Sequence, residues 1–551
     1  MTKKITWDTT LEPIYYPKEI KNKYFKLSIK LRSKFVDWVG DISFNFRNEY
    51  LWWIKLPSSR DPYKNNLFKN ILILLILNDQ KILRNLECLI FENKSIYKSV
   101  NKNKKIDLKK IKIKFKKNNY LLKFINSIIF SFFAFLIVKI STKNHRFSKE
   151  NYVFINTIVD TKDKIHDFVF PGLYEILKTK KKKNVFFIPN FLVHRNIFNF
   201  YKNVKLLSKK DFIFMENFIS FNEFLHSMIE LLLFDKLNIK KKKFKNFFSV
   251  DCSLLIIQEY RSKKDFFSEF QSILKVNFVK KLSKLNLNVV KTICRFENQS
   301  IDRSWFYGFR KYFPKVKNLG YQGFLYYPQY LNQSPTLYEE KAKVIPNEIL
   351  VPGKQSFLNR NEFYKGIKLK IAPSFNRQVL EKKFEGKKVY KFTLALCGIY
   401  SLDVNLISWI IFVLSKNNNL RVVIKPHPIL SINKFQNLIP KKLLKQIKFS
   451  NEPVYRLLQK TEFLISSGPT SIIFESLLYG CKLLYLNLDP SDIYILKKKL
   501  IKKKSFEFIR DKLSLFKIMN KYNNSSMTEK KYYTNSFFYS KLSNSNLKFF
   551  Y

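Results

Sequence analysis

The chain has 551 residues, of which 46% are hydrophobic and 26% are charged. This length leaves room for two or three domains, and the composition excludes an intrinsically disordered protein. The formal net charge is +60, because 102 Lys and Arg residues face only 42 Asp and Glu residues.

The positive charge has two explanations. Lys, Asn, Ile and Phe have AT-rich codons and are abundant along the whole chain, so a biased genome would supply much of the charge as solvated lysine. The rest of the positive charge favours an anionic partner. Basic and aromatic residues are dispersed and no zinc-finger spacing occurs, so an anionic membrane surface fits better than a nucleic acid. We therefore expect no nucleic-acid partner.

The cysteines indicate a reducing compartment. The five are far apart, and none belongs to a Cys-x-x-Cys motif. An odd number of isolated thiols is typical of a reduced cytoplasmic protein. The stretch MTKKITWDTTLEP at the amino end also lacks the apolar core of a secretion signal. The expected location is cytoplasmic, with peripheral attachment to the inner face of the cell membrane.

The first distinctive segment is FINSIIFSFFAFLIV, from Phe124 to Val138, which carries no charge and lies between Lys123 and Lys139. Three alternatives exist: a buried core helix, a helix in the membrane interface held by the lysines, and a spanning helix. A span needs about 20 apolar residues, so this segment is short for one. We place the core helix first, the interfacial helix second and the span third.

Farther along the chain, strands and helices alternate. NVVKTICRFENQ predicts a strand ending at Glu297, DRSWFYGFRKYF a helix, KVKNLGYQG a strand, and NEILVPGK a strand ending at Gly353. Polar residues and glycines therefore collect at strand ends. That pattern is expected of residues beside a ligand, because parallel α/β sheets bind ligands beyond the carboxyl ends of their strands.

Scarce residues draw attention to the same half of the chain. Only 11 glycines occur in 551 residues, and nine of them lie between Gly308 and Gly480. His427 is the only histidine in the last three hundred residues. Because the biased composition has replaced most dispensable glycines, the remaining ones mark turns and close backbone contacts that tolerate no other residue.

The alternation continues to Leu488. LRVVIKPHP, QIKFSN, TEFLISS and KLLYLNL predict strands, while EPVYRLLQK, with Asn451 as its cap, and PTSIIFESLLY, with Gly480 at its end, predict helices. Short links between strands and helices imply a parallel sheet covered on both faces. His427 and the Ser466–Ser471 stretch both follow strands, so we expect them to face one crevice.

The stretch after TEFLISS suits a nucleotide. Gly468 lets the backbone approach a ligand, and Pro469 suits the first helical position. The helix start and the nearby hydroxyl groups would bind phosphate. Glu475, one turn into the helix, could accept hydrogen bonds from ribose hydroxyls. The alternative is an ordinary capped helix whose Glu475 reaches solvent or pairs with a lysine. His427 between two prolines favours the nucleotide site.

At these residues the sequence resembles bacterial GT-B glycosyltransferases of surface and capsular polysaccharide biosynthesis, which are related to Kdo, polysialic acid and glycerophosphate transferases. KPHP and, about forty residues later, SSGPTSIIFESLLYG resemble their His-Pro and Ser-Ser/Thr-Ser motifs. ICRFENQSIDRSWFYGFRKYFPKVKNLGYQGFLYYP and WWIKLPSSRDPYKNNLFKN (Trp52–Asn70) extend the resemblance over most of the chain, with gaps around 90–150 and 200–280.

The resemblance implies an α/β fold of GT-B architecture. Two Rossmann-like parallel-sheet domains would face a central cleft, with a helical apolar insertion in the first. The expected domains are residues 1–370 for the acceptor, including the basic-flanked apolar segment at about 120–142, residues 371–520 for the nucleotide, and a tail at 521–551. The nucleotide would be bound by Lys425, His427, Ser467, Gly468, Thr470, Ser471 and Glu475.

The expected activity is transfer of a sugar from a nucleotide-activated donor, with a CMP-linked donor favoured, to a growing polysaccharide or lipid-linked glycan. His427 would stabilise the leaving phosphate, and Glu297 is the first choice of general base. The competing acids are Asp160, Asp163 and Asp167, with His166 among them, and Arg377 could reach a phosphate. No Asp-x-Asp motif follows a strand, so neither a metal nor a cofactor is expected.

Three alternative functions stay open at this point. A polyol-phosphate transferase would share these motifs and differ only in its donor. A sugar-nucleotide epimerase would use a similar two-sheet cleft but would leave the apolar segment without a role. A non-enzymatic basic protein that binds membrane or RNA would explain the charge and leave His427, Gly468 and Glu475 unexplained.

Overall fold

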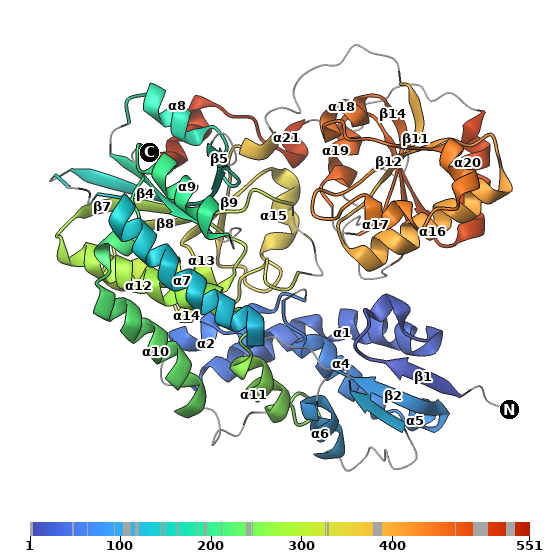
Figure 1. Ribbon diagram of the computed structural model, residues 1–551, viewed down its shortest axis with the longest axis horizontal. Coiled ribbons are helices and arrows are strands. Elements are labelled where there is room, and N and C mark those ends of the chain that lie inside the picture. Colours follow the sequence, from blue (N-terminus) through green and yellow to red (C-terminus); the bar gives the residue numbers. More distant parts are fainter. Residues whose placement is uncertain are drawn as a thin grey trace.

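The computed structural model describes residues 4–551 apart from several gaps, the longest of which are 103–111, 116–120, 238–243, 378–387, 489–504 and 525–534. The described residues form sheets of three, seven and six strands (Figure 1). Each of the two larger sheets belongs to an α/β unit, and the smallest lies in a lobe built from the chain before α7.

The amino-terminal lobe is a small parallel sheet covered by helices. Its strands are β1 (Ile5–Asp8), β2 (Leu86–Phe91) and β3 (Lys112–Phe115), in the order β1-β2-β3. Four of its helices are α1 (Lys18–Ser43), α4 (Leu67–Leu77), α5 (Gln80–Asn85) and α6 (Lys94–Lys102). The sequence did not indicate this lobe, because its strands are short and are separated by a long helical stretch.

The first α/β unit contains a seven-stranded sheet in the order β10-β9-β8-β7-β4-β5, with β6 also paired to β4. All pairings are parallel except that between β4 and β5. The strands are β4 (Asn151–Thr161), β5 (Ile165–Asp167), β6 (Val185–Asn190), β7 (Asn288–Arg295), β8 (Lys317–Tyr321), β9 (Glu348–Val351) and β10 (Lys368–Ile371). The order β6-β4-β7-β8-β9 is that of flavodoxin-like doubly wound sheets.

Helices pack on both faces of this sheet (Figure 1). Those that matter below are α7 (Leu121–Ser141), α9 (Ile197–Leu207), α10 (Phe221–Leu237), α12 (Phe266–Lys284) and α13 (Ser300–Tyr312). The others are α2 (Glu49–Ile54), α3 (Leu56–Ser59), α8 (Leu173–Thr179), α11 (Ser253–Arg261), α14 (Leu337–Lys341) and α15 (Lys354–Arg360).

The second α/β unit has a six-stranded parallel sheet in the order β13-β12-β11-β14-β15-β16. Its strands are β11 (Tyr390–Ala395), β12 (Val422–Lys425), β13 (Ile447–Phe449), β14 (Thr461–Ser466), β15 (Lys482–Leu486) and β16 (Phe506–Ile509). Its helices are α16 (Tyr400–Lys416), α17 (Asn433–Gln436), α18 (Val454–Gln459), α19 (Ile472–Leu478) and α20 (Lys512–Asn523). Counted along the chain, this is the 3-2-1-4-5-6 order of Rossmann folds.

The end of the chain returns to the first unit. Helices α21 (Asn535–Phe538) and α22 (Asn544–Leu547) follow the second sheet. The backbone N–H of Ser540 donates to Pro352 O at 2.5 Å, and Phe550 packs on Phe170 and Tyr321 of the first unit. A side chain at Gly353 would meet Phe538 O at 2.4 Å, so glycine is needed where the returning segment crosses.

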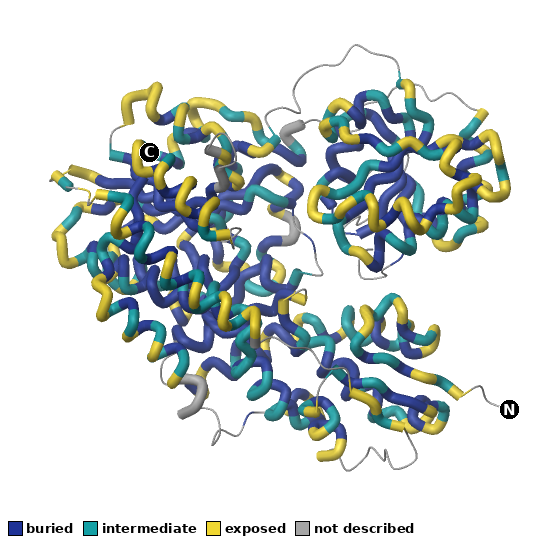
Figure 2. Tube along the Cα trace, in the orientation of Figure 1, coloured by how far each residue is buried: buried dark blue, intermediate teal, exposed yellow. Residues whose placement is uncertain are grey.

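The expected fold class is confirmed, since both larger sheets are Rossmann-like and are joined in series, which is the GT-B arrangement. One helix boundary was wrong: α18 begins after Pro453, which has no capping side chain, so Asn451 is not its cap. The expected core helix at 124–138 was also wrong. Only 22% of the most apolar 18-residue stretch within Leu122–Ser141 is buried, and Figure 2 shows exposed and intermediate residues along this helix.

Candidate functional site

The register of the second sheet brings three strand ends together. Ala395, the last residue of β11, pairs with Lys425 of β12 on one side and with Ser466 of β14 on the other. In the Rossmann order, β11 and β14 form the switch point of the sheet, where a crevice opens beyond the strand ends. The Pro-His-Pro and Ser-Ser stretches therefore lie at the same edge of the sheet, on either side of the end of β11, where one crevice was predicted.

The loops that follow these strands are in contact. Gly398 has φ +86°, and a Cβ built there would lie 2.6 Å from Nδ1 of His427. Gly468 has φ +77°, and a Cβ there would lie 2.9 Å from Sγ of Cys397. Both glycines are required, because their backbone conformation disfavours other residues and a side chain would collide with the next loop.

The loop after β11 was missed in the sequence. Both carboxylate oxygens of Asp403 cap it: Oδ1 accepts from Cys397 N at 2.7 Å and Oδ2 accepts from Gly398 N at 2.9 Å. Burial raises the pKa of Asp403 to about 6, while these hydrogen bonds act in the opposite direction. The signal was present, since Gly398 is one of the few glycines and separates an apolar run from a helix.

His427 is half-buried and has a defined tautomer. Its Nδ1 accepts from the backbone N–H of Ile429 at 3.3 Å. Because Nδ1 is then an acceptor, the proton of the neutral ring resides on Nε2, which can donate to a ligand. Burial also lowers the pKa of His427, so the neutral form is favoured.

The serines after β14 differ in their partners. Ser466 Oγ donates to Ala395 O at 3.0 Å and ties β14 to β11. Ser467 Oγ is fully buried at the same edge and has no hydrogen-bond partner among the described residues. Native proteins seldom leave a buried hydroxyl unpaired, and an unpaired group of this kind is expected where a ligand completes the site. Thr470 follows in the same turn, where its N–H donates to Gly468 O at 3.0 Å.

Helix α19 begins later than expected. It starts at Ile472 rather than at Pro469, which lies outside the described residues, and it ends before Gly480 at φ +70° as predicted. At seven residues it has only two turns. The hydroxyl groups and His427 are therefore better candidates for contacts with phosphate than the amino end of this short helix.

Glu475 has a partner that the sequence did not predict. Arg377 Nη2 lies 2.9 Å from Glu475 Oε1 and donates to Ser471 Oγ at 2.8 Å. The guanidinium also lies over the ring of Tyr539, 5.8 Å from its centroid. The ion pair is thus made by an arginine of the inter-unit segment and not by a lysine, as one alternative had it. Arg377 orients both side chains from outside the sheet.

Lys425 lies at the end of β12, beside this group. Its Nζ donates to Ser450 O at 3.4 Å, near the end of β13. Burial lowers the pKa of Lys425, and the charge of Glu452 opposes that shift. The ammonium therefore lies on the β13 side of β12.

Glu297, the expected base, lies in the first α/β unit just beyond β7. Its side chain is 37% exposed, and Oε1 lies 3.4 Å from Arg295 Nη1. Its backbone N–H donates to Asp302 Oδ2 at 2.9 Å, within the capping box that starts α13. Glu297 is thus accessible and held at a strand end.

The competing acids differ from Glu297. Asp167 Oδ1 accepts from Val169 N and Phe170 N, each at 2.8 Å, and burial raises the pKa of Asp167 to about 6. It is a structural cap of the turn before α8. His166 is exposed on β5. The side chain of Asp160 and all of Asp163 lie outside the described residues.

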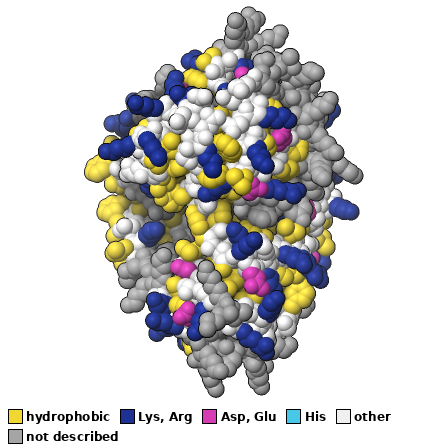
Figure 3. All heavy atoms as spheres, turned by 90° about the vertical axis from the view of Figure 1, so that its right-hand side faces the viewer, with side chains coloured by type: hydrophobic (Ala, Val, Ile, Leu, Met, Phe, Trp, Pro, Cys, Tyr) yellow, Lys and Arg dark blue, Asp and Glu magenta, His cyan; other side chains and the backbone are white. Residues whose placement is uncertain are grey.

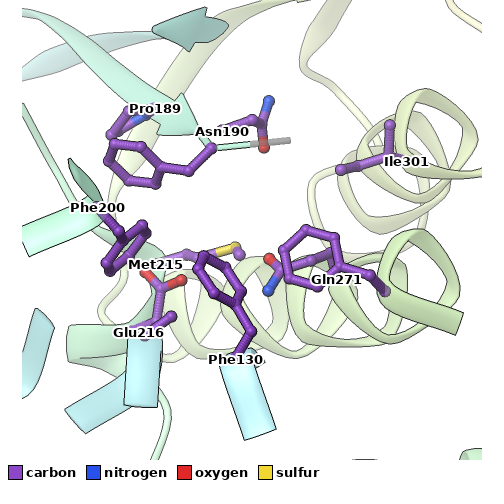
Figure 4. Close-up of a pocket in the computed structure, with 11 residues that line it drawn as sticks. Phe130, Pro189, Asn190, Phe200, Met215, Glu216, Gln271 and Ile301 are labelled. Atoms are coloured by element: carbon purple, nitrogen blue, oxygen red, sulfur yellow. The ribbon is translucent and has the colours of Figure 1, made fainter. Parts of the chain in front are cut away.

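A pocket in the first unit was not predicted at all. It lies beyond the carboxyl end of β6, where Pro189 and Asn190 meet helices α7 and α12 and the short 3-10 helix η2 (Met215–Phe218) (Figure 4). Phe130 and Gln271 point into it, and so does Glu216, whose pKa burial raises to about 7. The volume of the pocket is about 20 Å³, which is enough for a water molecule but not for a sugar.

Surface charge and metal-ligand clusters give no second candidate. Figure 3 shows Lys and Arg side chains spread over one face among hydrophobic ones, rather than gathered in a patch. Within the described ranges, no group of three or more His, Cys, Asp and Glu side chains could share a metal ion. The strand ends of the second sheet therefore remain the best-formed site.

Comparison with known proteins gives only distant similarities. No family model and no curated protein matches the sequence. Among solved structures, TarM is 12% identical at a TM-score of 0.38, covering 68% of this chain and 92% of that chain. MurG from Acinetobacter baumannii is 10% identical at 0.36, covering 68% and 91%. A UDP-GlcNAc 2-epimerase from Neisseria meningitidis bound to UDP-GlcNAc is 10% identical at 0.36, covering 70% and 95%.

Proposed function

We propose that this chain is a GT-B glycosyltransferase that moves a sugar from a nucleotide-activated donor to a growing surface polysaccharide or lipid-linked glycan. The observation that carries the proposal is the convergence at the switch point of the second sheet. There, two glycines of positive φ allow the loop after β11 to contact both His427 and the turn that holds Ser467, whose buried hydroxyl has no partner among the described residues. A set of neutral donors at a Rossmann switch point suits the phosphates of a nucleotide.

The proposed donor pose follows from these groups. The phosphates would accept from His427 Nε2 and from the hydroxyls of Ser467 and Thr470, with Gly468 allowing their close approach and Lys425 adding positive charge. The ribose hydroxyls would donate to Glu475. Arg377 holds the carboxylate of Glu475 in place for that contact. A CMP-linked donor remains the first choice, on the resemblance of the motifs alone.

The chemistry would be largely electrostatic. As the bond to the sugar breaks, negative charge builds on the leaving phosphate, and preorganised donors stabilise it; losing one such donor commonly lowers the rate by about a hundredfold or more. If the reaction inverts the configuration of the transferred sugar, a base must take the proton from the acceptor hydroxyl. Glu297, exposed beyond a strand end of the other unit, is proposed for that role. The proposed reaction needs no bound metal.

Calorimetric titration of the full chain with CMP, CDP, UDP and GDP tests the site. We expect one nucleotide to bind to the wild type and to bind at least about tenfold more weakly, a loss of about 1.4 kcal/mol, to His427→Ala. The matched control is His226→Ala, an exposed histidine of α10, which should bind like the wild type. Equal affinity in wild type and His427→Ala would reject this crevice.

Product analysis with the matching sugar nucleotide tests the reaction. A transferase releases the nucleotide and passes the sugar to an acceptor or, slowly, to water. An epimerase would instead return an isomeric sugar still joined to its nucleotide, and a polyol-phosphate transferase would process only a polyol-linked nucleotide. Binding of RNA that falls steeply with salt, in place of nucleotide binding, would favour the non-enzymatic alternative.

A further inference from the structure

Helix α7 presents its apolar side to solvent. The exposed residues Leu122, Ile125, Ile129, Phe133 and Ile140 recur every three, four or seven positions and so form one stripe. Phe133 is 49% exposed and Ile140 is 83% exposed. A surface helix ordinarily turns charged and polar residues outward, so an apolar stripe of this length on the outer side is unusual.

The opposite side of α7 explains why the helix stays on the protein. Ala134, Phe135 and Val138 are buried against the first α/β unit. Phe130 contacts Phe200 of α9 with ring centroids 5.6 Å apart. The helix is therefore apolar all round, with one side used for folding and the other unoccupied by any described part of the chain. Figure 1 shows it lying across the front of this unit.

Neighbouring helices extend the apolar surface. Helix α9, which packs beside α7, exposes Phe198 (80%) and Tyr201 at its start. Phe221, the first residue of α10, is exposed next to Phe132, with ring centroids 6.2 Å apart. We call the exposed apolar residues of the three helices the α7 face; they are Leu122, Ile125, Ile129, Phe133, Ile140, Phe198, Tyr201 and Phe221.

Lysines border the α7 face along α7 and α9, and the acidic residues of the described helices around it lie on α10. Lys123 and Lys143 lie beside the two ends of α7, and Lys202 and Lys205 are exposed on α9. Neither α7 nor α9 contains Asp or Glu. On α10, Glu223 lies 2.7 Å from Lys281, which neutralises it. An apolar surface with a one-signed basic border is complementary to an anionic lipid bilayer, where hydrocarbon lies beneath negative headgroups.

We propose that the α7 face docks the protein on an anionic membrane surface, with α7 lying in the plane of the interface. The large side chains Ile129 and Phe133 would enter the boundary between headgroups and acyl chains, while the lysines contact the headgroups. Helix α7 does not cross the bilayer in this arrangement, because its other side remains packed on the protein.

The α7 face also lies close to a strand-end region of the first sheet. Phe130 and Ala134, on the inner side of α7, line the pocket beyond β6. A docked protein would therefore hold the carboxyl end of its first sheet near the membrane. If the proposed transferase function is correct, this placement favours an acceptor that is carried on a lipid; the docking itself does not depend on that function.

Vesicle flotation with the full chain tests the docking. We expect the wild type to float with vesicles of phosphatidylcholine containing about a third phosphatidylglycerol and to bind pure phosphatidylcholine less, since each lysine near the surface contributes about fivefold in affinity. High salt should weaken this binding. The double variant Ile129→Glu/Phe133→Glu should lower it at least tenfold, and Ile140→Glu, at the most exposed position, should lower it as well.

Leu513→Glu is the matched control, because Leu513 is 57% exposed on α20 of the other unit. It should float like the wild type. Equal losses in the control and the α7 variants, or a wild type that stays in solution with every vesicle, would overturn the proposal. A wild type that ignores vesicles and doubles its mass, reverting to monomer in the α7 variants, would assign the face to a second copy of the chain instead.

Nucleotide titration of the same variants separates this proposal from the transferase function. The α7 variants should bind nucleotide like the wild type, since the α7 face belongs to the first unit. Vesicle binding without any nucleotide binding would reject the proposed function and leave the docking standing. Nucleotide binding without vesicle binding would do the opposite.

Discussion

Arg377 Nη2 lies 2.9 Å from Glu475 Oε1, so an arginine of the segment between the two α/β units holds the one carboxylate of α19. The carboxylate is almost fully buried, whereas the guanidinium is about one-third exposed. The two partners are therefore unequal. Glu475 depends on Arg377 for its charge to be tolerated, while Arg377 retains access to water.

This inequality predicts unequal effects of mutation. Arg377→Ala leaves a buried carboxylate without its cation and should lower the free energy of unfolding by about 2–3 kcal/mol, less than for a fully buried pair because water can replace the arginine. Glu475→Gln should lower it by about 1 kcal/mol, since the freed guanidinium can be hydrated. Urea unfolding measures both.

The control for this pair is Arg421→Ala. Arg421 lies in the same α/β unit, is exposed, and donates only to nearby backbone carbonyls. Its loss should change the free energy of unfolding by less than about 0.5 kcal/mol. If Arg377→Ala is no more destabilising than Arg421→Ala, the pair does not stabilise the start of α19.

Ser466 and Ser467 offer a second contrast. Ser466→Ala removes the hydrogen bond to Ala395 O and should destabilise the protein by about 1 kcal/mol. Ser467→Ala removes a buried hydroxyl that has no partner, so stability should be unchanged or higher by up to about 1 kcal/mol. Nucleotide affinity should fall mainly in Ser467→Ala. Thermal unfolding and calorimetry on both variants check this; the reverse ranking in affinity would remove Ser467 from the site.

Two glycines of similar backbone conformation separate strain from function. Gly398→Ala and Gly172→Ala both place alanine at positive φ, +86° and +80° respectively, and each should cost about 1–2 kcal/mol. A Cβ at Gly398 also meets His427 Nδ1 at 2.6 Å, whereas no atom of the described residues lies within 4 Å of one at Gly172. Gly398→Ala alone should weaken nucleotide binding, by about tenfold or more. Equal nucleotide affinity in the two variants would mean that the position of His427 does not matter for nucleotide binding.

The second α/β unit was the most predictable part of the molecule. Its strands are short apolar runs ended by Pro, Gly or Ser, and these local signals suffice to place His427 and Ser467 at the same edge of the sheet. The loop at Gly398 carried the same kind of signal. The partner of Glu475 could not be predicted, because Arg377 is 98 positions away and reaches Glu475 only through the packing of the inter-unit segment.

The first α/β unit and the lobe were less predictable for physical reasons. The segment at 124–138 is uniformly apolar, and hydrophobic periodicity cannot tell which side of such a helix is packed. The pocket at Glu216 is assembled from β6, η2 and four α-helices that are distant in sequence. Their residues have no common spacing, so only the tertiary fold brings them together.

Glu216 in that pocket predicts a pH dependence of stability. Burial raises its pKa from the ordinary value of 4.5 to about 7, with Lys139 acting in the opposite direction. The folded protein therefore binds a proton more tightly than the unfolded chain. The stabilisation by this proton is complete below pH 4.5 and is lost as the pH rises through about 7, a change of about 3 kcal/mol.

Glu216→Gln isolates this contribution, because other buried carboxyls such as Asp403 titrate in both proteins. Glutamine stays neutral, so the variant should lose less stability than the wild type as the pH rises from about 5 to about 8. The difference between the two free energies of unfolding, followed by urea titration across this range, should change by up to about 3 kcal/mol in favour of the variant. A constant difference would mean that Glu216 is ionised in the folded protein throughout, with water or Lys139 compensating its charge in the pocket.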